Sequence, residues 1–111
     1  MKKRIRLSIN TADSQHTVVG IDVEHKKIEK TIDAKRMRSQ VLLPMIEEIL
    51  KEKKLTLTDI TEIRVNPGPG SFTGLRVGLA VAQTLGKFLN IPVNGKPAGE
   101  VRPIYSDSKW E

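Results

Sequence analysis

The chain has 111 residues, enough for one domain with a modest hydrophobic core. Hydrophobic residues make up 38% and charged residues 29%, a composition typical of a soluble globular domain, and the absence of cysteine excludes disulfides and thiolate metal sites. The net charge is +6, and residues 1–54 carry most of it, with 13 Lys and Arg against 8 Asp and Glu; this indicates either an ordinary lysine-rich surface or a nucleic-acid contact.

No stretch of the chain predicts export or membrane insertion. The basic residues 1–4 are followed by alternating polar and apolar residues instead of the apolar core of a signal peptide. The apolar run Leu75–Leu89 contains Arg76 and Lys87 and is shorter than the ~20 residues that span a bilayer. We therefore expect a cytoplasmic protein with no membrane contact.

The first third of the chain predicts three strands. Ile5, Leu7 and Ile9 alternate with polar residues, the pattern of a half-buried strand over residues 4–9. Two further β-branched runs follow at 16–23 and 28–32, each after a short polar turn. Short connections between consecutive strands predict an antiparallel meander.

The rest of the chain alternates helices and strands. Apolar residues at helical spacing predict a first helix within residues 34–54, then a strand at 60–65, a second helix at 73–89 and a short strand at 91–93. The order β-β-β-α-β-α-β predicts an α/β fold with a mixed five-stranded sheet and two main helices, the arrangement of ribonuclease H and of one lobe of an actin-like ATPase. We expect residues 1–95 to form this lobe, and residues 96–111 to form a tail that can hold one extra strand at 101–105.

A loop rich in proline and glycine leads into the second helix. Such a loop is a possible anion site, because backbone N–H groups and the helix dipole point toward it. It fits no phosphate motif, since no lysine follows Gly74, Thr73 replaces the third glycine of a dinucleotide fingerprint, and Pro67 and Pro69 lack N–H donors. We favour a rigid structural loop and leave a phosphate site open. The loop residues are Pro67, Gly68, Pro69, Gly70, Ser71, Phe72, Thr73 and Gly74.

The second helix carries a small residue at every fourth position: Gly74, Gly78, Ala82 and Gly86. This spacing places the four on one face, where each glycine costs about 1 kcal/mol relative to alanine. We expect another backbone to approach this face closely. Because the helix is apolar nearly all round, its remaining surface is covered either by a partner protein or by the first helix.

Residues 66–80, NPGPGSFTGLRVGLA, resemble the segment GPGSFTGLRIGL of the bacterial tRNA threonylcarbamoyladenosine biosynthesis protein TsaB, also called YeaZ. RSQVLLPMI at 38–46 is similar to the HSxxLLPLI helix start of that family, LTLTDI at 55–60 to its gLtlxDld link, and NIPV at 90–93 to its lgIPlvgv run. The resemblance covers roughly residues 5–95.

The resemblance implies an actin-like lobe that is not itself catalytic. Members of the family pair with the catalytic protein TsaD, and with the ATPase TsaE, in placing threonylcarbamoyl on a tRNA adenosine. Their N-terminal lobes pack helices into a bundle with this partner or with a second copy, so tRNA is reached indirectly. By position, the residues that the resemblance assigns to the partner interface are Ser39, Leu42, Leu43, Ile46, Leu75, Val77, Gly78, Leu79, Val81, Ala82 and Leu85.

Two departures from the family pattern bear on chemistry. The family carries Asp-Thr-Ser after its first strand, where this chain has Asn10-Thr11-Ala12, so the carboxylate that related hydrolases link to a metal is replaced. The chain also stops soon after the first of two lobes, which leaves no nucleotide cleft between lobes within one chain.

His16 and His25 lack a second ligand at metal spacing. We expect no metal, no cofactor and no enzymatic activity.

Three other functions stay open at this point. The basic first half allows a small nucleic-acid-binding module. The short length allows a homodimeric relict with no role in tRNA modification. A nucleotide-hydrolysing enzyme is the third alternative.

Overall fold

The computed structural model describes residues 4–12, 16–33, 39–70, 72–97, 99 and 101–102, without the side chains of 32–33, 39–41 and 72–73. The elements in chain order are β1 (Ile5–Asn10), β2 (His16–Val23), β3 (Lys26–Asp33), α1 (Ser39–Glu52), the short 3₁₀ helix η2 (Leu57–Asp59), β4 (Glu62–Val65) and α2 (Phe72–Leu89). Of the extra strand expected at 101–105, only residues 101 and 102 belong to the described part, so that expectation lies largely outside it.

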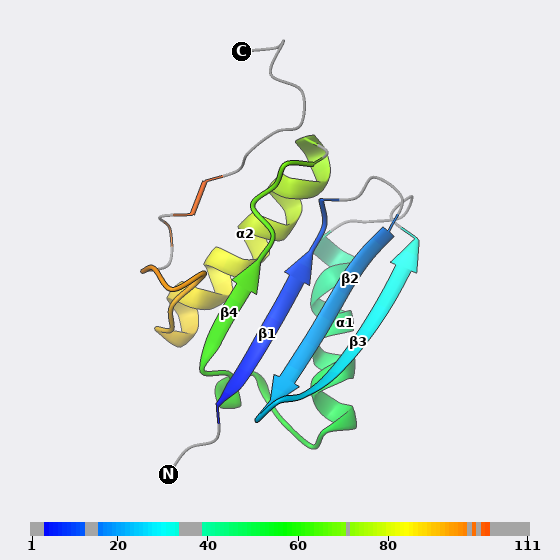
Figure 1. Ribbon diagram of the computed structural model, residues 1–111, viewed down its shortest axis with the longest axis vertical. Helices are drawn as coiled ribbons and strands as arrows, with labels where there is room; N and C mark the ends of the chain where they lie inside the picture. The colour runs from blue at the N-terminus through cyan, green and yellow to red at the C-terminus, as the bar shows by residue number, and fades with distance from the viewer. Residues whose placement is uncertain are drawn as a thin grey trace.

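The four strands form one mixed sheet in the order β3-β2-β1-β4 (Figure 1). β1, β2 and β3 pair antiparallel, which confirms the predicted meander, and β4 joins β1 in parallel after the α1 crossover. Glu24 and His25 close the β2–β3 hairpin with φ angles of 48° and 76°, the left-handed pair of a tight hairpin turn. The mixed α/β fold with two main helices is therefore as predicted.

The expected fifth strand is wrong as a strand. Within the described residues, the segment after α2 makes a single parallel bridge, between Val93 and Ile63 of β4. Pro92 before the bridge has no N–H to extend a ladder, and Asn94 after it adopts a φ of 54° and turns the chain back, so that Val93 pairs with Lys96.

Both helices cover the same face of the sheet (Figure 1). α1 packs on β2 and β3, α2 packs on β1 and β4, and the two helices contact each other. Because strand side chains alternate, one residue in two along each strand points into this layer, and most of these residues are apolar. The core combines Leu7, Ile9, Val19, Ile21 and Ile63 of the sheet with Leu42, Ile46, Ile49, Leu79 and Ala82 of the helices.

Ion pairs join elements that are distant in sequence. On β3, the Lys30 ammonium lies 2.5 Å from the Glu48 carboxylate and 2.6 Å from that of Glu52, which ties the sheet edge to α1. These two hydrogen bonds, that of Glu48 first, raise the pKa of Lys30, and Lys30 in turn lowers the pKa of Glu48. The basic first half of the chain, residues 1–54, therefore has part of its positive charge in ion pairs with carboxylates.

On the opposite face of the sheet, Glu62 of β4 binds two arginines of the β1 segment. Arg4 Nε lies 2.9 Å from one carboxylate oxygen and Arg6 Nε lies 3.1 Å from the other. The hydrogen bond from Arg4 is the main cause that holds the pKa of Glu62 below its usual range. This cluster reinforces the parallel β1–β4 pairing from the polar side.

Candidate functional site

The loop between β4 and α2 is held against the end of β1. Asn66 donates from Nδ2 to Asn10 Oδ1 at 3.1 Å and accepts at Oδ1 from the Gly68 N–H at 2.9 Å. Gly68 has a φ of 117°, which favours glycine. Gly70 lies so close to Ala12 that any side chain there would overlap the Ala12 backbone. The loop is thus held to the end of β1 at both Asn66 and Gly70.

The other loop residues complete this connection. A cis peptide bond links Gly68 to Pro69, and Pro67 is half-buried. Ser71 and the side chains of Phe72 and Thr73 lie outside the described residues, so their capping of α2 and the alternative of a phosphate site stay predictions.

At Gly78, the small-residue face of α2 is approached by a side chain of the same chain and not by the backbone that was predicted. Thr11, just after β1, is almost fully buried, and its hydroxyl donates to the Gly74 carbonyl at 2.5 Å. A methyl group at Gly78 would overlap that hydroxyl. The missing side chain at Gly78 therefore lets the start of α2 pack closely against the end of β1, a contact that the sequence alone did not locate.

Most residues assigned to the partner interface lie in the chain's own core. Gly78 is buried against Thr11, and the other buried members fill the space between helices and sheet. A partner cannot touch these side chains without opening the core. They are Leu42, Ile46, Leu75, Leu79, Val81, Ala82 and Leu85.

The outer surface of the helices retains a smaller apolar set. Leu43 of α1 has 40% of its surface exposed, and Val77 of α2 is half-buried at the edge of the core. Phe88, in the last turn of α2, has 78% of its surface exposed and was missed among the candidate residues. Its signal was its spacing, since Val77, Val81 and Phe88 share one side of the helix. The side chain of Ser39 lies outside the description.

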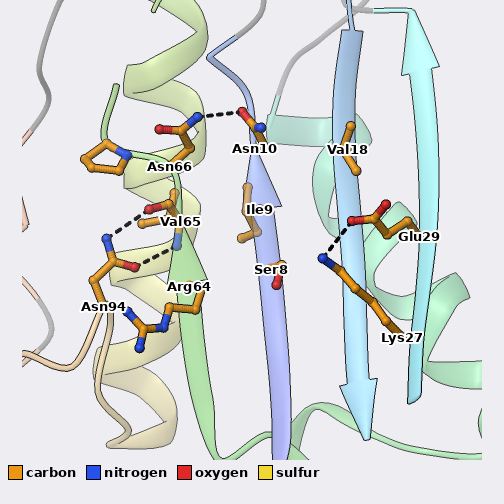
Figure 2. Close-up of a pocket in the computed structure, with 11 residues that line it drawn as sticks. Ser8, Ile9, Asn10, Val18, Lys27, Glu29, Arg64, Val65, Asn66 and Asn94 are labelled. Atoms are coloured by element: carbon orange, nitrogen blue, oxygen red, sulfur yellow. Dashed lines mark hydrogen bonds and ion pairs between the residues drawn. The ribbon is translucent and has the colours of Figure 1, made fainter. Parts of the chain in front are cut away.

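The end of β1 borders a hollow on the open face of the sheet, with a volume of about 550 Å³ (Figure 2). Asn10 stands where the family pattern has aspartate, and its Oδ1 accepts hydrogen bonds from Asn66 Nδ2 and from the Ala12 N–H, both at 3.1 Å. On the far wall, Lys27 and Glu29 pair at 3.0 Å. The amide of Asn10 thus serves as an uncharged structural acceptor. Across the part of the chain that the structure describes, no three metal-ligating side chains gather.

Comparison with known proteins identifies the family of the chain. Residues 26–95 match the model of the family described as TsaD, tRNA N6-adenosine threonylcarbamoyltransferase. The tRNA threonylcarbamoyladenosine biosynthesis protein TsaB of Buchnera aphidicola subsp. Baizongia pistaciae is 40% identical over 82 residues, which are 72% of this chain and 37% of that protein. TsaB of Escherichia coli is 42% identical over 60 residues, which are 54% of this chain and 26% of that protein.

A solved structure agrees with the sequence matches. YeaZ from Pseudomonas aeruginosa superposes with a TM-score of 0.74 at 30% identity, over 84% of this chain and 42% of that one. The predicted ribonuclease-H-like and actin-like lobe is therefore confirmed. None of the helices in the described residues is long and apolar enough to span a bilayer.

The chain spans less than half the length of these relatives, so the activity and partners of the whole proteins do not pass to it directly. The family-model match covers β3, both helices, β4 and the proline- and glycine-rich loop between β4 and α2. By its match to the family model over more than half of its residues, the chain belongs to the TsaD family, and it corresponds to part of the TsaB, or YeaZ, proteins within it.

Proposed function

We propose that the chain is a non-catalytic subunit that supports threonylcarbamoyl transfer to a tRNA adenosine by binding a TsaD-like catalytic partner through α1 and α2. The observation that carries the proposal is the pair of exposed apolar side chains on the helix layer, Leu43 and Phe88, in a chain whose relatives bear the name of this modification. Large exposed apolar side chains on a packed helix layer are typical of a surface that a partner covers.

The proposal assigns the partner contact to the outer side of the helices. Leu43 and Phe88 stand out from the layer, and Val77 lies at its rim. Helices of a partner that pack along α1 and α2 would bury these side chains in a bundle without disturbing the core beneath them. A second copy of the chain offers the same surface and is the competing occupant, and a TsaE-like ATPase would join once the partner is bound.

The absence of catalysis by this chain is also part of the proposal. Asn10 cannot supply the negative charge of the aspartate that the family pattern has there, and its Oδ1 accepts hydrogen bonds from Asn66 and Ala12 that hold the loop in place. The proposal places the chemistry in the partner and places the complex in the cytoplasm, where tRNA is modified.

The test is co-purification of the chain with the TsaD homologue of the same organism. Phe88→Lys should reduce the recovered complex at least tenfold, because a lysine that loses its water against a partner helix is costly. The substitution leaves the fold intact because the side chain is mostly exposed. Thr31→Lys, at an exposed position of β3, is the matched control for adding one positive charge.

Mass measurement of the purified species separates the possible results. A one-to-one complex that Phe88→Lys disrupts and Thr31→Lys preserves supports the proposal. A chain that forms only a homodimer in the presence of the TsaD homologue, or a complex indifferent to Phe88→Lys, would show the proposed interface to be wrong.

A further inference from the structure

The segment from Ile63 of β4 to Gly99, after the α2 turn, is basic and contains no acidic residue. Between residues 63 and 99 the chain carries Arg64, Arg76, Lys87 and Lys96, and no Asp or Glu. All four side chains belong to exposed residues. In the first half of the chain, by contrast, Lys30 and other basic side chains have carboxylate partners.

Three of these side chains surround one turn beside β4. The turn passes through Asn94 and Gly95, and Val93 pairs with Lys96 across it. Asn94 fixes the turn to β4, because its Oδ1 accepts from the Val65 N–H at 2.8 Å and its Nδ2 donates to the Val65 carbonyl at 2.9 Å (Figure 2). The cations near this turn are thus carried on an anchored backbone.

A hollow lies on each side of the turn. The hollow on the sheet face, about 550 Å³, is lined by Arg64 and Asn94, which Figure 2 shows beside each other along β4. The second hollow, about 500 Å³, is lined by Lys87 and Lys96 at the end of α2. We call Arg64, Lys87 and Lys96 the basic edge.

The charges of the basic edge are weakly compensated. Within the described residues, Lys87 and Lys96 make no ion pair. Arg64 Nε lies 3.9 Å from Glu62, whose two oxygens already accept from Arg4 and Arg6. A lysine in the last turn of a helix complements the helix dipole, which accounts for Lys87 but not for Lys96 or Arg64.

We propose that the basic edge binds the phosphodiester backbone of RNA. Exposed, weakly compensated cations beside two hollows suit a chain of phosphates at regular intervals, and such contacts carry no base sequence. The choice of tRNA as the RNA rests on the proposed function; the backbone contact itself does not. The Lys87 side chain lies close to Gly99, which follows the turn in sequence. In the proposed arrangement, RNA approaches beside β4 and the partner protein occupies the outer side of the helices.

The experiment measures binding of a fluorescently labelled tRNA transcript to the full chain by anisotropy between 50 and 300 mM salt. Lys87→Ala with Lys96→Ala should weaken binding on the order of tenfold at 100 mM salt, and should reduce the slope of log K against log salt by about 1.4 to 1.8, because each phosphate contact contributes about 0.7 to 0.9. Arg64→Ala should reduce the slope by about half of that amount.

The matched control removes the same charge elsewhere. Lys51→Ala with Lys53→Ala takes two exposed lysines from the end of α1 and should leave the slope nearly unchanged. Equal losses in the two double variants would indicate attraction by net charge alone and overturn the assignment, as would no tRNA binding at 50 mM salt.

Co-purification of Lys87→Ala with Lys96→Ala and the TsaD homologue keeps the two proposals apart. Intact co-purification together with weakened tRNA binding supports the basic edge as an RNA contact independent of the partner. If the Phe88→Lys test fails while the tRNA results hold, the proposed partner interface falls and the RNA contact stands.

Discussion

Single side-chain volumes decide how the start of α2 meets the sheet. The hydroxyl of Thr11 occupies the space that a side chain at Gly78 would need, and it donates to the Gly74 carbonyl one turn earlier. Glycine at these positions weakens the helix, but it permits a contact that joins β1 to α2. Glycine therefore weakens the helix at this position but is needed for packing within the chain itself.

Gly78→Ala should destabilise the protein although alanine is the better helix former. Overlap with the Thr11 hydroxyl costs about 1 to 3 kcal/mol, which exceeds the gain of about 1 kcal/mol in helix propensity. Urea unfolding should show a lower midpoint, and adding Thr11→Ala should recover part of the loss, since the two sites share one contact. Ala80→Gly, at an exposed position, measures the propensity term alone. A Gly78→Ala protein more stable than the parent would contradict the packing argument.

At the scale of elements, α1 is attached to the sheet edge by charge as well as by its apolar face. Lys30 reaches from β3 to two carboxylates one helical turn apart, Glu48 and Glu52. Holding one ammonium between two carboxylates costs less side-chain entropy for each ion pair than holding two separate lysines. The contact joins the outermost strand to the helix that follows it in sequence.

Lys30→Met should lower the stability of the protein at low salt and make the remaining stability less dependent on salt. The attraction between exposed charges is screened as ionic strength rises, so the parent should lose more of its urea midpoint than the variant between 50 and 500 mM salt. Lys27→Met removes an ion pair that stays within β3 and controls for the loss of one lysine. Equal salt dependence of the parent and Lys30→Met would argue against a stabilising role for this link.

At the scale of the whole molecule, the sheet separates an apolar side, covered by both helices, from a polar side. Side chains on the polar side form ion pairs between neighbouring strands. In one such cluster, Glu62 of β4 pairs with Arg4 and Arg6. The pKa of Glu62 is lowered chiefly by the hydrogen bond from Arg4, so the folded state favours the ionised carboxylate. The stability that this shift contributes is present above the usual glutamate pKa and is lost as the pH falls through the lowered value.

Acid should therefore weaken the fold through Glu62. Urea midpoints measured from about pH 6 to about pH 3 should fall as the pH drops, and Glu62→Gln should flatten this dependence while lowering stability at neutral pH. Glu24→Gln, in the exposed β2–β3 turn, controls for the loss of one carboxylate. If Glu62→Gln and the parent lose stability in parallel on acidification, the cluster is not a source of the pH dependence.

The sequence was sufficient for the architecture because side-chain period and burial agree. Ile5, Leu7 and Ile9 alternate and are all buried, and Leu42, Ile46 and Ile49 follow the helical period and face the same core. The fifth strand could not be judged from its apolar residues alone, since Pro92 and Asn94 limit it to one bridge through the backbone.

The candidate site was harder to predict because apolar residues look alike whether they face the core or a partner. Leu75 and Leu79 are buried, whereas Phe88 on the same helix is exposed, and only the position of α2 on β1 and β4 separates them. The basic edge depends on tertiary pairing in the same way. Asn94 fixes the turn that carries Lys96 to β4, the strand that carries Arg64, although Asn94 lies 29 residues beyond Val65 at the end of that strand.

The side chain of Asn94 has a consequence for the behaviour of the protein at high concentration. By bonding both the N–H and the carbonyl of Val65, it occupies the groups with which the outer edge of β4 would recruit a strand from another molecule. At the opposite edge, β3 presents Lys26, Lys27 and Glu29, charges that oppose strand addition. Both edge strands therefore resist the addition of a strand from another molecule. At β4 the Asn94 amide occupies the backbone groups, and at β3 the charged side chains oppose pairing.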